Sequence, residues 1–125
     1  GSHGTTFGGG ALASAAALAV LEVIEKEDLL AKVTRQSPPW HARLRGLAGL
    51  RPDLVAEVRG AGYMVGVALR CDPVPVCVAL REAGLLAAPA GGVAVRLLPP
   101  LTASAEELEE AAEVMSRVLR DWKAA

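Results

Sequence analysis

The sequence predicts an α+β fold in which helices cover one face of a small, mainly antiparallel sheet. Three observations support this fold class. Apolar residues recur with a helical period near both ends of the chain, at 11–26 and 104–122. Between them, 55–69 and 85–97 hold short runs rich in β-branched residues that are interrupted by glycines. Strands grouped between helices are typical of an α+β layer structure.

Length and composition narrow the classes of function. A chain of 125 residues can bury one core but is short for a two-domain enzyme. Its formal net charge is −1, and 52% of its residues are hydrophobic. Without a long basic run, we expect neither nucleic-acid binding nor a membrane partner. The apolar stretch 11–24 is too short to span a bilayer, and no basic leader precedes it. Two cysteines in no metal or disulfide pattern suggest a cytoplasmic protein.

The first ten residues, Gly1-Ser2-His3-Gly4-Thr5-Thr6-Phe7-Gly8-Gly9-Gly10, form a glycine-rich loop directly before a helix. Hydroxyls and free amides at a helix N-terminus suit an anion such as phosphate, although a flexible chain end is the alternative. The helix is predicted over 11–26. Its predicted buried stripe contains Leu12, Ala16, Ala19, Val20 and Val23. We expect one region at 1–27, the glycine-rich motif and connecting helix, and a small α+β domain at 28–125.

The helical pattern continues after residue 28. Asp28 is a plausible N-cap for a helix over 29–35, and Ser37-Pro38-Pro39 is predicted to end it. Ser37 can cap a third segment, with Pro38 in its first position. That segment carries its apolar side chains at spacings of four and three. They are Trp40, Leu44 and Leu47.

A hairpin is predicted next, with strands at 55–59 and 63–69 and a turn at 60–62. Gly66 inside the second strand suggests a bulge or a close backbone approach. A short helix over 76–83, closed by Gly84, and two short strands at 85–88 and 93–97 follow. In the last helix, Ser104 and Glu107 have the spacing of a capping box.

Arg96 is the one charged residue in the apolar run 93–98, so it either points to solvent or holds a carboxylate through its planar guanidinium. The pattern alone favours solvent, because arginine is rarely buried unless it is paired. The other polar residues have structural interpretations. They are His3 and His41, with no metal-ligand spacing; Cys71 and Cys77, expected to be inert; and Glu106, Glu107, Glu109 and Glu110, expected to be solvated.

The order of motifs resembles that of the class III, pyridoxal-phosphate-dependent aminotransferases, most closely the acetylornithine aminotransferase branch. Four stretches carry the resemblance: the opening 1–9, the alanine-rich 15–24, Val58-Arg59-Gly60-Ala61-Gly62-Tyr63-Met64-Val65-Gly66-Val67, and Val95-Arg96-Leu97-Leu98-Pro99-Pro100-Leu101. They cover nearly the whole chain. The family usually has Asn-Pro after the paired glycines, where this sequence has Gly10-Ala11. The difference removes an amide side chain and a helix-opening proline.

The resemblance implies the C-terminal small domain of a fold type I pyridoxal-phosphate-dependent transferase. By its motifs, Thr6 matches the threonine that contacts the cofactor phosphate across the dimer interface, and Thr5 a neighbouring substrate-side position. Arg96 matches the arginine that holds a carboxylate of the amino-acid substrate. Implied partners are the large domain, a second subunit of a homodimer, and amino-acid and 2-oxo-acid substrates.

The resemblance also implies that the lysine that binds the cofactor covalently precedes the glycine-rich motif. The lysines present are Lys26, Lys32 and Lys123, and none has a setting that nominates it. We therefore expect the C-terminal portion of an acetylornithine:2-oxoglutarate aminotransferase of arginine or lysine biosynthesis, with no catalytic residue of its own and no turnover alone. The alternative is a stand-alone module for oligomerisation or binding. The sequence does not choose between N-acetylornithine, ornithine and related ω-amino substrates.

Overall fold

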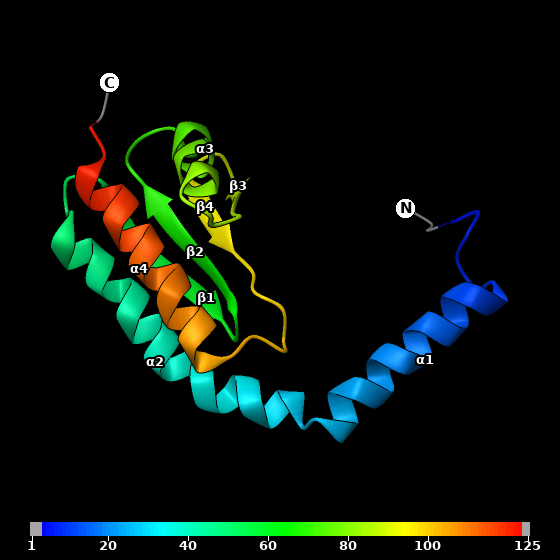
Figure 1. The fold of residues 1–125 in the computed structure, drawn as a ribbon. Coiled ribbons are helices and arrows are strands. Elements are labelled where there is room, and N and C mark those ends of the chain that lie inside the picture. Colours follow the sequence, from blue (N-terminus) through cyan, green and yellow to red (C-terminus); the bar gives the residue numbers. More distant parts are fainter. Residues whose placement is uncertain (1–3, 124–125) are drawn as a thin grey trace. The chain divides into compact units, whose positions relative to one another are not determined.

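The computed structural model describes residues 4–123, which fall into two compact units divided between Lys32 and Val33. Figure 1 labels their helices and strands. The first unit holds helix α1 and the start of helix α2, and the second holds everything that follows.

Helix α1, Ala11–Lys26, has the predicted bounds. Its alanines favour the helix because they lose no side-chain entropy when the backbone is ordered. Gly10 occupies the N-cap in an extended conformation, and no side chain caps this end of the helix. Two residues after the end of this helix, Asp28 has a left-handed backbone conformation with a φ of +47°. The predicted buried stripe is wrong for this structure, because α1 contains no buried residue and Leu12 is 86% exposed.

Helix α2, Leu29–Leu50, is continuous and includes both prolines, so the predicted break at Ser37-Pro38-Pro39 is wrong. A proline inside a helix removes a backbone donor and crowds the carbonyl four residues earlier. Here the Ser37 hydroxyl donates to the Val33 carbonyl at 2.6 Å, within the turn before the prolines. The apolar side chains beyond them provide the tertiary contacts that favour continuation. They are Trp40, Leu44 and Leu47, all buried.

The sheet has four antiparallel strands in the order β1-β2-β4-β3, which confirms the predicted small antiparallel sheet. Its strands are β1, Val55–Ala61; β2, Met64–Leu69; β3, Ala88–Ala90; and β4, Ala94–Leu97. The β1–β2 hairpin is confirmed, but β1 continues through Gly60 and Ala61. Its turn is therefore Gly62-Tyr63, with Gly62 at a φ of +55°.

Two glycines of the hairpin have different environments. A Cβ on Gly60 would overlap the Met64 carbonyl oxygen and lie 2.9 Å from the Val65 Cα, so this position excludes a side chain. A Cβ on Gly66 would lie 3.8 Å from the Arg59 carbonyl oxygen, which is ordinary van der Waals contact. Gly66 pairs regularly with Arg59, so the bulge, one of the two alternatives expected at Gly66, is absent there. The register instead shifts on β1, between Val55 and Glu57.

Helix α3, Pro73–Glu82, begins earlier than predicted because the Asp72 side chain accepts from the Val74 amide at 2.9 Å and Pro73 occupies the first turn. Helix α4, Ala105–Asp121, begins with the predicted capping box. The Glu107 amide donates to the Ser104 hydroxyl at 3.2 Å, and the Glu107 carboxylate accepts from the Ser104 amide at 2.7 Å.

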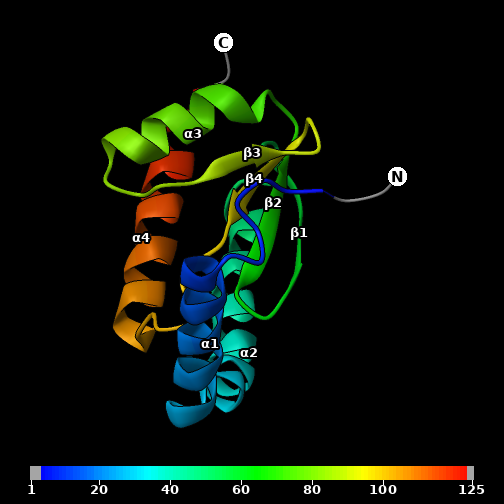
Figure 2. The same cartoon turned by 90° about the vertical axis from the view of Figure 1, so that its right-hand side faces the viewer.

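In the second unit, α2 from Val33 onward, α3 and α4 pack on the same face of the sheet, as predicted. Figures 1 and 2 show α2 and α4 along this face. Arg43 of α2 and Glu109 of α4 join them through an ion pair of 2.7 Å. The core side chains of the strands alternate along each strand. They are Val55, Val65, Val67, Leu69, Val95 and Leu97, all at most 5% exposed. The residues between them point to the opposite face, which we call the open face.

Arg51, one residue past the end of α2, connects the end of α2 to the C-terminal end of α4. Its Nη1 donates to the carbonyl oxygens of Leu119 at 2.6 Å and Trp122 at 3.0 Å, which are otherwise unpaired acceptors of a helix end. Its Nη2 lies 2.7 Å from the Asp53 carboxylate. This ion pair lowers the pKa of Asp53, mainly through the hydrogen bond from Arg51.

Candidate functional site

Arg96 lies on the open face of the sheet, in β4. It pairs with Gly66 of β2 on one side and Ala88 of β3 on the other. Its side chain is exposed, and among residues 4–123 it has neither an ion pair nor a hydrogen bond. A surface hollow of about 500 Å³ surrounds it. The hollow is lined by Arg59, Gly60, Ala61, Met64, Gly66, Ala90, Ala94 and Arg96. Arg96 is therefore an unpaired cation on an otherwise largely apolar surface.

Sequence reasoning missed Arg59, the second guanidinium of this hollow. Arg59 pairs with Gly66 across the β1–β2 ladder, so Arg59, Gly66 and Arg96 form one row across three strands. Because side chains alternate between faces, directly opposite residues share a face, and both arginines lie on the open face. The Arg59 Nη1 lies 2.6 Å from the Glu57 carboxylate, whereas Arg96 has no carboxylate partner among the described side chains. Only the strand register reveals this row.

The glycine-rich loop lies in the first unit. The Thr5 hydroxyl accepts from the Gly8 amide at 3.1 Å, which is the local turn role that competes with ligand binding for such a residue. Thr6 is exposed. Because no side chain caps Gly10, the first amides of α1 have no side-chain acceptor. A hydroxyl and free helix amides are donors that fit a phosphate group.

Lys26 and the two cysteines lie in settings that do not favour reactivity. The Lys26 ammonium lies 3.3 Å from the Glu22 carboxylate on an exposed helix surface. Burial raises the pKa of the Cys77 thiol, and burial together with the nearby Asp72 charge raises the pKa of the Cys71 thiol. A raised pKa keeps both thiols protonated near neutral pH, which agrees with the expectation that they are inert.

The remaining polar candidates have structural contacts. The His41 Nε2 lies 2.8 Å from the Gly62 carbonyl oxygen, next to the hairpin turn. His3 lies outside the described residues. Within residues 4–123, no group of three or more histidine, cysteine, aspartate or glutamate side chains is arranged to hold a metal ion. The Glu106 pKa is lowered by backbone and Ser104 hydrogen bonds at the start of α4, while Glu109 pairs with Arg43.

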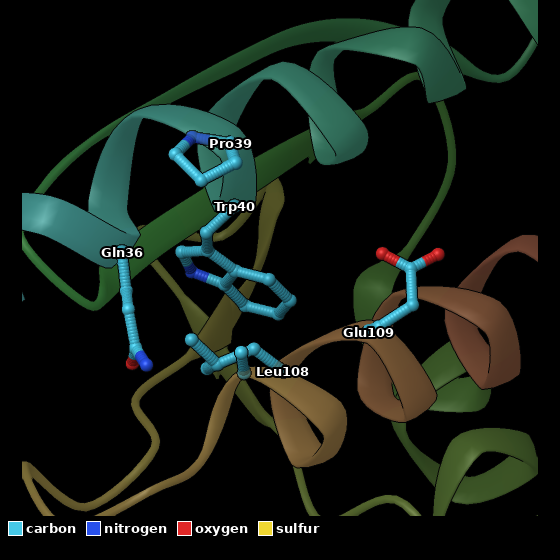
Figure 3. A pocket seen from close by; sticks show the side chains of 6 residues that line it. Gln36, Pro39, Trp40, Leu108 and Glu109 are labelled. Atoms are coloured by element: carbon cyan, nitrogen blue, oxygen red, sulfur yellow. The ribbon is translucent and has the colours of Figure 1, made fainter.

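A second hollow, shown in Figure 3, lies between α2 and α4. Its volume is about 220 Å³, below the usual range of ligand pockets. It is lined by Gln36, Pro39, Trp40, Ala105, Leu108 and Glu109. The Trp40 Nε1 is buried without a partner among the described residues, and the Gln36 amide oxygen accepts from the Tyr63 hydroxyl. We interpret it as a packing gap between two helices.

No helix in the described part of the chain is both long and apolar enough to cross a membrane. Helix α1 is apolar but has 16 residues, and α2 is interrupted by charged side chains.

Comparisons with known proteins all match this chain to one family. Residues 1–119 match the family model described as aminotransferase class-III. The acetylornithine aminotransferase of Thermosynechococcus vestitus is 44% identical over 123 residues, which cover 95% of this chain and 30% of that protein. The ornithine aminotransferase of an Exiguobacterium species is 40% identical over 119 residues, covering 95% of this chain and 29% of that protein.

Comparison with solved structures matches the chain to aminotransferases as well. The acetylornithine aminotransferase of Elizabethkingia anophelis superposes with a TM-score of 0.84 at 32% identity, covering 98% of this chain and 31% of that one. The ornithine aminotransferase of Plasmodium yoelii superposes with a TM-score of 0.84 at 27% identity, covering 96% of this chain and 32% of that one. The chain therefore spans about 30% of the length of the relatives it matches.

Proposed function

The chain belongs to the class III aminotransferases, and from this premise we propose that it is the C-terminal portion of a pyridoxal-phosphate-dependent enzyme of the acetylornithine type. The reaction we propose exchanges the δ-amino group of N-acetylornithine, or a related ω-amino substrate, with 2-oxoglutarate. Such an enzyme would serve arginine or lysine biosynthesis as a cytoplasmic homodimer. The support for the substrate class is the set of acetylornithine and ornithine aminotransferases among the relatives.

The observation that carries the proposal is the environment of Arg96. An unpaired guanidinium in a hollow of about 500 Å³, with glycine and alanine around it, leaves room for a carboxylate to approach in the plane of the two nitrogens. Arginine binds carboxylates in this bidentate manner better than lysine does, because its donors form a rigid fork. We assign Arg96 to the substrate carboxylate. Its role is to bind and orient the substrate.

The glycine-rich loop is assigned to the phosphate group of the cofactor. Thr6 would donate its hydroxyl to that phosphate in the partner subunit, and the uncapped start of α1 adds amide donors and a favourable dipole. Thr5 is assigned to the substrate side of the same loop, although its hydroxyl already accepts from the Gly8 amide. When bound, pyridoxal phosphate supplies the electron sink for bond changes at the substrate carbon.

In our proposal, this chain does not supply the lysine that binds the cofactor covalently. Lys26 is paired with Glu22 on the surface of α1, a setting unlike the desolvated pocket that activates an amine. We therefore expect no turnover from the 125 residues alone. Activity requires the large domain that carries the lysine.

A second candidate function is a non-catalytic module that oligomerises through exposed apolar surface. The observation that favours it is α1, which is apolar yet has no buried residue. Sedimentation equilibrium of the isolated chain separates the two ideas. A stable oligomer favours the module, and a monomer at all concentrations counts against it.

The test of the aminotransferase proposal joins this chain to the upstream part of the Thermosynechococcus vestitus enzyme, in place of that enzyme's own C-terminal portion. Glutamate formation from N-acetylornithine and 2-oxoglutarate is expected from the joined protein and not from the chain alone. Thr6→Val should weaken cofactor retention during dialysis, while Thr34→Val, a threonine of α2, should leave it unchanged. A joined protein that folds and binds cofactor but forms no glutamate would contradict the proposal.

A further inference from the structure

Glu57 carries the only carboxylate in the four strands, all of which lie within the described residues. It stands two positions before Arg59 on β1, so both side chains lie on the open face. The row that contains Glu57 is therefore next to the row that joins Arg59 to Arg96. A carboxylate in this place is a natural partner for an unpaired guanidinium.

Only small side chains of the described strand β2 lie between Glu57 and Arg96. On the open face, β2 has Gly66 in the row of Arg96 and Ala68 in the row of Glu57. Two strand intervals are about 10 Å and two residues along a strand are about 7 Å, which places the Cα atoms of Glu57 and Arg96 about 12 Å apart. Extended glutamate and arginine side chains together span that separation. The carboxylate and the guanidinium can therefore meet.

Arg59 holds the Glu57 side chain in the structure. The Arg59 Nη1 donates to the Glu57 carboxylate at 2.6 Å. The side chains are 65% exposed for Arg59 and 54% for Glu57, so this is a surface ion pair. Surface ion pairs are weak, so a carboxylate that loses one guanidinium can pair with another one within its reach.

Resting on the proposed function, in which Arg96 binds the substrate carboxylate, we infer that Arg59 is a positioning residue that holds Glu57 and so keeps it from pairing with Arg96. Arg59 touches neither substrate nor cofactor in this role. A Glu57 carboxylate on Arg96 would occupy the same planar donors that the substrate carboxylate needs. Because Glu57 belongs to the same sheet, it would compete as an intramolecular ligand, whose effective concentration is high.

The first test uses the 125-residue chain and no turnover. NMR measures the rate of rotation about the Nε–Cζ bond of Arg96, which an ion pair slows. Arg59→Gln should slow this rotation by about two- to fivefold, the factor that corresponds to the strength of an exposed ion pair. Arg59→Gln combined with Glu57→Gln should restore the wild-type rate. The matched control is Arg81→Gln, an exposed arginine of α3, which should leave the rate unchanged.

The second test measures turnover of the joined protein at increasing 2-oxoglutarate concentrations. Arg59→Gln should raise the concentration at half-maximal turnover by about two- to fivefold and leave the maximal rate unchanged. Arg59→Lys, which can still hold the Glu57 carboxylate, should restore the wild-type value. Arg59→Gln with Glu57→Gln should restore it as well, which a merely structural role of Arg59 does not predict.

Two results would overturn the inference. One is an Arg96 rotation rate in the Arg59→Gln chain equal to the wild-type rate. The other is a slowed rate that persists when Glu57→Gln is added. Failure of the proposed function gives a different result, because Arg96→Gln would then leave the half-saturating 2-oxoglutarate concentration unchanged. If Arg96→Gln raises that concentration and Arg59→Gln does not, the positioning role of Arg59 alone is refuted.

Discussion

Replacement of Gly60 by alanine should destabilise the second unit, whereas the same change at Gly66, in the adjoining strand, should not. The new Cβ at position 60 would overlap the Met64 carbonyl oxygen and lie 2.9 Å from the Val65 Cα. Both are backbone atoms of the paired strand, so no side-chain rotation relieves the overlap. The hairpin must open locally, and overpacking of this kind costs about 1–3 kcal/mol.

Gly66 is the matched control because it lies in the same hairpin. A Cβ there would be 3.8 Å from the Arg59 carbonyl oxygen and 4.0 Å from the Ala94 Cβ, which are ordinary contacts. Alanine also loses less backbone entropy than glycine on folding, so Gly66→Ala should leave the free energy of unfolding unchanged or raise it by about 0.5–1 kcal/mol.

Urea unfolding followed by tryptophan fluorescence measures the difference. Trp40 and Trp122 both lie in the second unit, so the signal does not depend on α1. With a slope of about 2 kcal/mol per molar urea, Gly60→Ala should lower the midpoint by about 0.5–1.5 M. Equal midpoints for Gly60→Ala and the wild-type chain would refute the reasoning, as would a loss at Gly66 as large as that at Gly60.

Three further predictions concern the ends of the helical layer and the thiols. Arg51→Met should speed amide hydrogen exchange in the last turn of α4, because it removes the donors to the Leu119 and Trp122 carbonyls, while Arg45→Met on the exposed surface of α2 should not. The lowered pKa of Asp53 stabilises the folded state above the pKa of the unfolded carboxyl, near 3.9, and this contribution is lost as the pH falls through the folded-state pKa. In the Asp53→Asn variant, the urea midpoint should therefore fall less than in the wild-type chain as the pH is lowered. An equal fall would contradict the role of the Arg51–Asp53 pair. Cys71 and Cys77 should react with iodoacetamide at pH 8 more slowly in the folded chain than in urea, since burial raises both pKa values, and equal rates would show accessible thiolates.

Local signals in the sequence predicted much of the fold. The Ser104–Glu107 capping box, the bounds of α1 and the β1–β2 hairpin each depend on residues within a few positions of one another. The helix break at Pro38 and Pro39 was also predicted from a local signal, and it was wrong. Burial of the apolar side chains of α2 on the sheet favours a continuous helix despite the two missing donors.

The candidate site could be predicted only in part. Arg96 stands out because it is a lone charge in an apolar strand, but its unpaired state depends on which side chains the fold brings near it. The row from Arg59 through Gly66 to Arg96 depends on two strand registers and on a bulge in β1, none of which a single sequence specifies. The buried stripe predicted for α1 was wrong for a similar reason. Periodicity identifies an apolar face of a helix but does not identify what covers it.

The central claim is that Arg96 holds the substrate carboxylate in an aminotransferase completed by a larger domain. The most direct measurement is the 2-oxoglutarate concentration at half-maximal turnover of the joined protein, compared between wild type, Arg96→Gln and Arg117→Gln, the last an exposed arginine of α4. Loss of a charge-assisted bidentate contact predicts a rise of about 10- to 100-fold for Arg96→Gln and no change for Arg117→Gln. Half-saturation of the Arg96→Gln protein at the wild-type concentration, with cofactor bound and turnover retained, would contradict the claim.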